Sequence, residues 1–185
     1  MSIARTLAVV ESKEQSLLKD VSLVILSSLL LALSSKVSIP LFFTPVPITI
    51  QNSLILLLAV LLGPRKGGAV VASLLAQTVM GFSVLSSGAV GLASFVGPTG
   101  GYLVGYLASA VLTGWLMERV FQRTVVHAFC AMLMGNVLVY LLGAGFLSTI
   151  IGVKAAFWLG VAPFILGDLW KLLATAKLLQ YLGWK

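Results

Sequence analysis

The sequence predicts an all-α membrane protein with six transmembrane helices, both termini in the cytoplasm, and an outward-facing pocket covered by apolar loops. Three observations lead to this fold class. Hydrophobic residues make up 59% of the 185 residues and charged residues only 9%, with a mean hydropathy of +1.11, whereas a soluble domain carries about 25% charged residues. The apolar residues gather in six separate segments. The basic residues between these segments are distributed unequally.

The six apolar segments are each near the length of about 20 residues that a bilayer-spanning helix requires. They lack the alternation of transmembrane β-strands. No linker divides the chain, so we expect one integral membrane domain over residues 1–185. Residues 1–20 are mixed polar, unlike a cleavable signal peptide, and form a predicted cytoplasmic segment. In order, the segments are Val21–Ser35, Ile48–Leu62, Gly68–Phe82, Gly100–Met117, Val125–Phe146 and Phe164–Tyr181.

The basic residues predict the orientation of the helices. Six spans place both termini on one side of the membrane. Only Lys36 and Lys154 then fall on the other side, and Lys171 lies within the last span. Because Lys and Arg are enriched in cytoplasmic loops, we expect both termini in the cytoplasm. The nine basic residues on that side are Arg5, Lys13, Lys19, Arg65, Lys66, Arg119, Arg123, Lys177 and Lys185.

The connections on the opposite, outer side differ from the short cytoplasmic ones. Ser38–Pro47 and Ser83–Thr99 are apolar and contain several Gly, Pro and Ser residues. Irregular backbone at membrane depth is tolerated where it is buried in protein or lines a cavity. We therefore predict that these two loops fold back as lids over a pocket.

Asp168 and Lys171 stand in the apolar run that forms the last span. Asp168 is the only acid after Glu118, and Lys171 follows it by three positions, which places both on one face of a helix. Ionisable residues within membrane spans are costly and usually face a bundle interior or a cavity. They are predicted to bind ligand near the outer face; the competing interpretation is a structural ion pair.

Other polar residues lie near the same outer face. Thr49 and Gln51 lie at the start of the second span. They are predicted either to contact ligand or to be ordinary polar residues at a helix end. Tyr102, Asn136 and Tyr140 lie inside apolar spans and either contact ligand or bond between helices. Gly105 and Ser109, by contrast, continue a spacing of small residues that lets two helices approach closely.

Several function classes lack candidate residues. The chain contains no G-x-x-x-x-G-K-[ST] phosphate loop and no hydrolase constellation, so neither ATP hydrolysis nor membrane enzymology is predicted. His127 and Cys130 are single residues of their kinds, so no metal or other cofactor is expected. The net charge of +7 is scattered between apolar runs, which indicates membrane topology and not nucleic-acid binding.

Four motifs follow one another between about Pro45 and Lys171: Val46–Gln51, Gly63–Gly67, Val96–Tyr102 and Pro163–Lys171. In their order and spacing they resemble the BioY family, the biotin-specific substrate-binding S components of energy-coupling factor (ECF) transporters. The resemblance implies six helices with both termini inside, in the cytoplasmic membrane of a bacterium.

The resemblance also implies roles for individual residues. Asp168 and Lys171 match the pair that contacts the ureido ring of biotin, where the carboxylate would accept an N–H and the ammonium would donate to the oxygen. From charge alone, Lys171 could instead bind the valerate carboxylate. The stretch implied to hold the carboxylate end comprises Gly81, Ser86, Ser87 and Gly88, and the further substrate-binding candidates are Thr49, Gln51, Tyr102 and Tyr140.

As an S component, the chain would work with a transmembrane T component and two cytoplasmic ATPases. The family's coupling motif of two alanines four positions apart appears here as Ser28 and Ala32, a departure at the first position. A self-sufficient carrier for a small amphipathic solute is the main alternative function. The third function considered is a lipid-modifying enzyme, for which the chain offers no catalytic groups.

Overall fold

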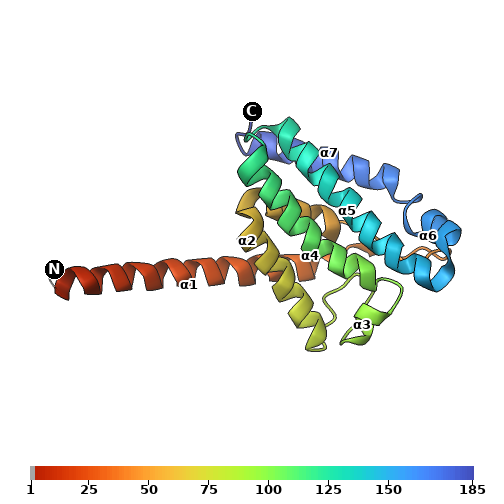
Figure 1. The fold of residues 1–185 in the computed structure, drawn as a ribbon, viewed down its shortest axis with the longest axis horizontal. Coiled ribbons are helices and arrows are strands. Elements are labelled where there is room, and N and C mark those ends of the chain that lie inside the picture. Colours follow the sequence, from red (N-terminus) through yellow and green to blue (C-terminus); the bar gives the residue numbers. More distant parts are fainter. Residues whose placement is uncertain (1–2) are drawn as a thin grey trace.

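The computed structural model describes residues 3–185, with side chains from residue 15 onward, and is built almost wholly of helices (Figure 1). The predicted all-α class is confirmed. Two two-residue strands, β1 (Ser38–Ile39) and β2 (Ile48–Thr49), pair antiparallel. A π-helical turn, η1 (Leu116–Val120), extends α4. Within the described residues the α-helices are α1 (Ile3–Ser34), α2 (Gln51–Val79), α3 (Ala93–Val96), α4 (Gly100–Trp115), α5 (Val125–Ile151), α6 (Val153–Gly160) and α7 (Ile165–Tyr181).

The long helix α2 is bent back on itself at Gly63. This residue has φ 76° and ψ 178° and is followed by Pro64, a backbone conformation that is essentially restricted to glycine. Beyond the bend the chain returns along its own first arm, since a Cβ on Gly67 would lie only 3.0 Å from the Cα of Ala59. Residues 51–62 and 64–79 therefore form two packed arms.

Four helical stretches are long and apolar enough to cross a membrane, and α6 with α7 forms a fifth candidate that is bent by 43°. The four are Gln15–Ser34, Gln51–Val79, Gly100–Val120 and Val125–Ile151. Two of the predicted spans thus fall within α2, one on each arm. By length and composition the structure thus has four or five candidate spans among the described residues, where the sequence predicts six.

The sequence did not predict α6 or the lengths of two helices. The predicted fifth segment stops at Phe146, but α5 continues to Ile151 and ends at Gly152, where φ is 83°. A second short helix, α6, follows at once. Helix α1 begins at Ile3, so it runs from the predicted polar segment 1–20 into the first span without a break.

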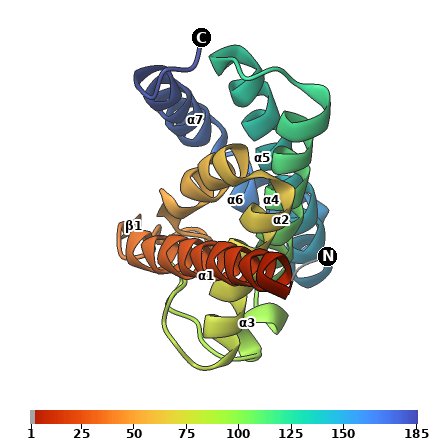
Figure 2. The ribbon, with the colours of Figure 1, turned by 90° about the vertical axis from the view of Figure 1, so that its left-hand side faces the viewer.

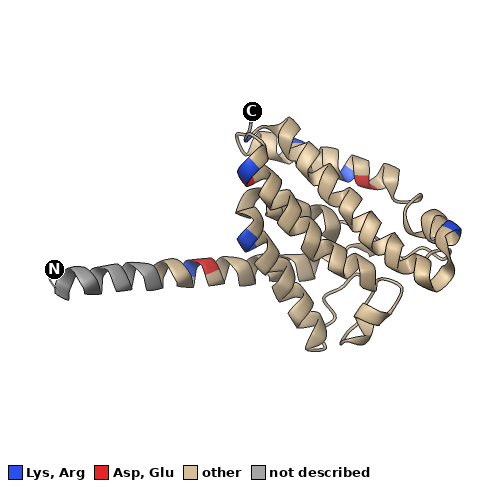
Figure 3. Cartoon of the chain, in the orientation of Figure 1, with Lys and Arg blue, Asp and Glu red and all other residues tan. Residues whose placement is uncertain are grey.

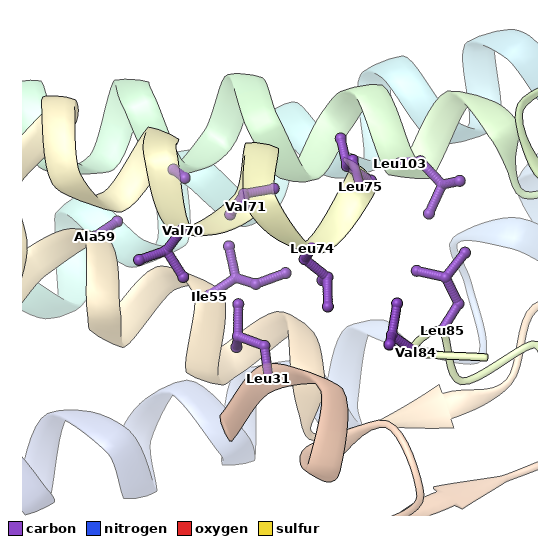
Figure 4. Packing of buried hydrophobic residues seen from close by; sticks show 11 residues of the cluster. Leu31, Ile55, Ala59, Val70, Val71, Leu74, Leu75, Val84, Leu85 and Leu103 are labelled. Atoms are coloured by element: carbon purple, nitrogen blue, oxygen red, sulfur yellow. The ribbon is translucent and has the colours of Figure 1, made fainter. Parts of the chain in front are cut away.

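The larger core cluster joins the two arms of α2 to α1 and α4. Figure 4 shows Ile55 of the first arm facing Val70 and Leu74 of the second, with Leu31 of α1 beneath them. Because lipid chains are as apolar as these side chains, close van der Waals packing and not removal from water would hold such helices together in a bilayer. A second cluster joins the first arm to α5 and α7 through residues that include Leu56, Met132 and Leu172.

Helices α4 and α5 lie side by side along their lengths (Figure 1). A Cβ on Gly101 would meet the Leu142 carbonyl oxygen at 2.5 Å, and one on Gly105 would lie 3.1 Å from the Cα of Val139. The close helix contact predicted from the small-residue spacing at Gly105 is confirmed.

The two ends of the helix bundle differ in chemistry. One end holds the α2 bend and the C-terminus, and several of the Lys and Arg positions that Figure 3 colours lie there. There Lys66 pairs with Asp20 at 2.5 Å, which ties α1 to α2. The other end carries the β1–β2 loop, the α3 loop and α6. Figure 2 shows α1 crossing the side of the bundle near α2.

Candidate functional site

Asp168 and Lys171 lie at the loop-bearing end of the bundle, on the first turns of α7. Asp168 is only 6% exposed although it is charged. The Lys171 Nζ lies 2.5 Å from Asp168 Oδ1, and it also donates to the Thr49 carbonyl oxygen at 2.7 Å. The ammonium thus links α7 to the strand that leads into α2. The i,i+3 pairing expected from the sequence is confirmed.

A second contact holds the carboxylate from the opposite side. The Tyr140 hydroxyl on α5 donates to Asp168 Oδ2 at 2.5 Å. Burying a carboxylate is unfavourable unless opposite charge and hydrogen bonds compensate. Each Asp168 oxygen has one such partner, and each carboxylate oxygen has two lone pairs. Asp168 therefore keeps the capacity to accept further hydrogen bonds.

These groups face a small cavity that we call the first chamber. Its volume is about 30 Å³, room for about one water molecule. It lies between the entry to α2 and helices α4, α5 and α7. Its lining residues are Val46, Pro47, Thr49, Asn52, Tyr102, Tyr106, Val139, Tyr140, Gly160, Phe164, Asp168 and Lys171.

A neighbouring cavity, the second chamber, lies beneath the loop that follows α2. Its volume is about 20 Å³. The two chambers share four lining residues, Val46, Pro47, Tyr102 and Tyr106, which form the partition between them. The other residues of the second chamber are Gln51, Leu85, Ser86, Ser87, Thr99 and Leu103.

Both chambers are much smaller than the roughly 300–1,000 Å³ of typical small-molecule pockets. The loops above them are tied down in this state. The Thr44 hydroxyl donates to the Leu159 carbonyl oxygen at 2.6 Å, and Lys36 Nζ donates to the Ser83 carbonyl oxygen at 2.9 Å. Binding of a ligand that fills a typical pocket would therefore require these loops or the partition residues to move.

The predicted substrate-binding residues divide between the two chambers. Tyr102 lines both. Gly81 and Gly88 line neither; they occupy exposed turns with φ of 94° and 71°, so their glycine identity is explained by backbone conformation. Gln51 also donates to the Leu31 and Val84 carbonyl oxygens. Thr49, Tyr140, Asp168 and Lys171 line the first chamber, and Gln51, Ser86 and Ser87 line the second.

Tyr102 is held in place by two glycines. Its hydroxyl donates to the Gly160 carbonyl oxygen at 2.8 Å. A Cβ on Gly143 would overlap the Tyr102 ring, and one on Gly160 would overlap its hydroxyl. The ring therefore packs directly against the backbone of α5 and α6.

Sequence reasoning missed two polar residues of the site, Tyr106 and Asn52. Tyr106 follows Tyr102 by one helical turn, so the same spacing argument that groups i and i+4 could have found it. Asn52 directly follows Gln51 and lines the first chamber. Asn136, predicted as either a ligand contact or an interhelical bond, accepts from Asn52 Nδ2 at 2.6 Å.

The two residues of the predicted partner surface, Ser28 and Ala32, both pack within the chain. Ser28 is 0% exposed, and its hydroxyl accepts from Gln77 Nε2 at 2.6 Å. Ala32 is half-buried and packs against the larger core cluster. Their role in coupling to a partner stays a prediction.

A larger cavity of about 450 Å³ opens at the opposite end of the bundle, beside Gly63, Glu118 and Trp184. Its carboxylate, Glu118, is half-exposed, unlike the buried Asp168. Buried, paired ionisable groups mark functional sites more often than exposed ones. We therefore place the candidate site at the two chambers. Among the side chains described, no three His, Cys, Asp or Glu residues lie together as metal ligands would.

Known proteins similar to this chain agree on one family. The sequence profile of the BioY family matches residues 6–184. A biotin transporter BioY from Rhizobium etli is 37% identical over 161 residues, which cover 82% of this chain and 86% of that one. One from Rhodobacter capsulatus is 37% identical over 170 residues, covering 85% and 89%. The crystal structure of the S-component for biotin from an ECF-type ABC transporter superposes with a TM-score of 0.81 at 28% identity, covering 91% of this chain and 92% of that one.

Proposed function

The chain belongs to the BioY family, and on that premise we propose that it is the biotin-binding S component of an ECF-type ABC transporter in the cytoplasmic membrane. It would bind biotin from outside and present it for ATP-driven uptake. The biotin transporters among its relatives match over most of their own length, which supports transfer of the whole function and not of one segment. The family is one of transporters and not of enzymes.

The observation that carries the proposal is the unused bonding capacity around Lys171 and Asp168. Lys171 Nζ has three N–H donors, and two of them contact Asp168 and the Thr49 carbonyl oxygen. The third is available to a ligand carbonyl. Asp168 retains lone pairs for ligand N–H groups. A ureido group offers one carbonyl acceptor and two N–H donors, so it complements this pair.

The partition between the chambers supports an extended ligand pose. A ureido ring in the first chamber would direct a valerate chain past Tyr102 and Tyr106 into the second chamber. Ser86 and Ser87 line that chamber and would hold the carboxylate end. Gly81 and Gly88 would act indirectly, through the turns that place the serines.

The opposite pose, with Lys171 on the valerate carboxylate, makes a different demand. In that pose, converting the ligand carboxylate to a primary amide removes its charge pair with Lys171. The amide would then lose much more binding affinity than it would in the first pose. We expect biotinamide to bind within about tenfold of biotin if Ser86 and Ser87 hold that end, because neutral and backbone donors also bind an amide oxygen.

The proposed topology counts the two arms of α2 as separate spans. With α1, α4, α5 and the α6–α7 unit, this gives six crossings in one domain, with both termini cytoplasmic. The asymmetry of basic residues between the two ends of the bundle supports this orientation. Asp168 would then lie near the outer face, beneath the lids.

A transmembrane T component and cytoplasmic ATPases are the partners we propose for uptake, because the chain itself has no phosphate-binding loop. Ala32 remains the proposed contact on α1, together with the exposed apolar residues beside it, Leu29 and Leu33. The alternative is a carrier that works alone.

Equilibrium binding of biotin to the purified protein in detergent tests the proposal. We expect saturable binding without ATP or partner proteins, and concentrative uptake into liposomes only when partners and ATP are present. Absence of biotin binding would remove the proposed function. Concentrative uptake by the chain alone would favour the self-sufficient carrier.

A further inference from the structure

Asn52 is a buried polar residue that lines the first chamber and has an unpartnered side-chain oxygen. It lies on the first turn of α2, is 8% exposed, and lines the chamber that holds Asp168 and Lys171. Its Nδ2 donates to Asn136 Oδ1 on α5 at 2.6 Å. Its Oδ1 is buried, and no group of the described residues donates to it.

A buried amide oxygen without a donor is unfavourable by about 1–3 kcal/mol. Such groups in a native structure call for a specific explanation, and a bound ligand is one. The Asn52 Nδ2 is already paired with Asn136, so only the oxygen of this amide is left without a partner. A ligand N–H group would satisfy it.

The orientation of the Asn52 amide follows from its neighbour. If it were rotated by 180° alone, two carbonyl oxygens, those of Asn52 and Asn136, would face each other at hydrogen-bond distance. The observed orientation avoids this repulsion and directs an acceptor, not a donor, away from Asn136.

We propose that Asn52 Oδ1 accepts one of the two ureido N–H groups of biotin, while Asp168 accepts the other and Lys171 donates to the ureido oxygen. This inference rests on the proposed function and assigns one further binding residue to it. The two N–H bonds of a cyclic urea diverge on either side of the carbonyl, so a single carboxylate does not accept both. Asn52 supplies the second acceptor, and the three groups then match the three polar groups of the ring.

This assignment makes Asn52 a specificity residue for ring ureas. A site built to hydrogen-bond a ligand N–H strongly rejects an analogue that lacks it, because the buried acceptor is left unpaired. Two cyclic carbamate analogues of biotin provide the probes. In each, one of the two ureido N–H groups is replaced by an oxygen atom, which preserves the size of the ring.

The first measurement uses the unmodified protein. We expect biotin to bind, and both carbamates to bind at least tenfold more weakly, since each leaves one of two acceptors unpaired. Weakening by only one of the two carbamates would overturn the Asn52 assignment, because it would indicate a single N–H acceptor. A protein that binds no biotin at all would overturn the proposed function together with the inference.

The second measurement uses Asn52→Leu, which has similar size and no acceptor. We expect roughly tenfold weaker biotin binding and loss of discrimination against one carbamate only, while discrimination against the other persists through Asp168. Ser53→Ala is the matched control, since Ser53 is also buried, directly follows Asn52 and lines neither chamber. It should leave all three relative affinities unchanged.

The pattern of discrimination separates binding from packing. If Asn52→Leu kept its discrimination against both carbamates, the role of Asn52 would be structural. Should Asn52→Leu fail to fold, the comparison with the unmodified protein still decides the question.

Discussion

The Tyr140 hydroxyl and the Asp168 carboxylate are joined by a 2.5 Å hydrogen bond that connects α5 to α7. The bond holds one oxygen of the carboxylate while Lys171 holds the other. The carboxylate is therefore fixed between two partners before any ligand arrives. Pre-organised groups of this kind lower the ordering cost of binding.

Tyr140→Phe should weaken biotin binding by roughly fivefold, because it removes one hydrogen bond to a charged group of the site. The protein should remain folded, since the ring is retained. Tyr181→Phe is the control, because Tyr181 lies at the end of α7 and is 77% exposed. The measurement is the biotin affinity of both variants by calorimetric titration. Equal affinities would show that the Tyr140 hydroxyl does not contribute to biotin binding.

Asp168→Asn and Lys171→Met should each weaken biotin binding by roughly ten- to a hundredfold. Charge-assisted hydrogen bonds are worth on the order of 1.5–3 kcal/mol, and the remaining partner is left as a buried unpaired charge. Affinity and melting temperature should be measured for both single variants and the double variant.

The double variant distinguishes a binding pair from a structural one. If the pair binds ligand, the double variant should recover some thermal stability but not affinity. Near-normal affinity in the double variant would show that the pair only locks α7, and the proposed site would then have to be abandoned.

Gly143→Ala should displace Tyr102 and so weaken binding. A Cβ on Gly143 overlaps the Tyr102 ring, and overpacking of this kind typically costs about 1–3 kcal/mol. Because Tyr102 lines both chambers, we expect a lower melting temperature together with lower biotin affinity. Gly145→Ala is the matched control on the same helix, since nothing lies within 4 Å of its added Cβ. Equal behaviour of the two variants would contradict the prediction.

Single cysteines should report opposite sides of the membrane for the α2 bend and the α3 loop. Arg65→Cys and Ser87→Cys, each in a Cys130→Ala background, place the thiol at exposed positions. With an impermeant reagent on intact cells, only Ser87→Cys should label. Labelling of both would contradict the proposed six-span topology and the outer location of Asp168.

The sequence allowed the fold class to be predicted because hydropathy depends on local composition. It did not reveal α6, because this helix has only eight residues and follows Gly152 directly, within the connection that carries Lys154. Nor did it reveal that Ser28 is covered by Gln77, because which face of a helix is buried depends on packing with distant segments.

The candidate site was predictable where a residue differs in polarity from the segment around it. Asp168 and Lys171 stand out as charges in an apolar run, and the structure brings them together with Tyr140 and Thr49. Asn52 and Tyr106 do not stand out, because single polar residues near a helix end have several ordinary roles. Their relevance arises only when α2, α4 and α7 converge on one chamber.

In the proposed six-span topology, the bend at Gly63 also determines on which side of the membrane every later loop lies. Each crossing of a bilayer exchanges inside for outside, so a continuous helix over residues 51–79 would invert the side of every later loop. A side chain at position 63 that forced ordinary helical dihedral angles would therefore act far beyond its own neighbourhood. It would carry the C-terminal half, including α7, to the opposite compartment and leave the two halves of the ligand site facing different solutions.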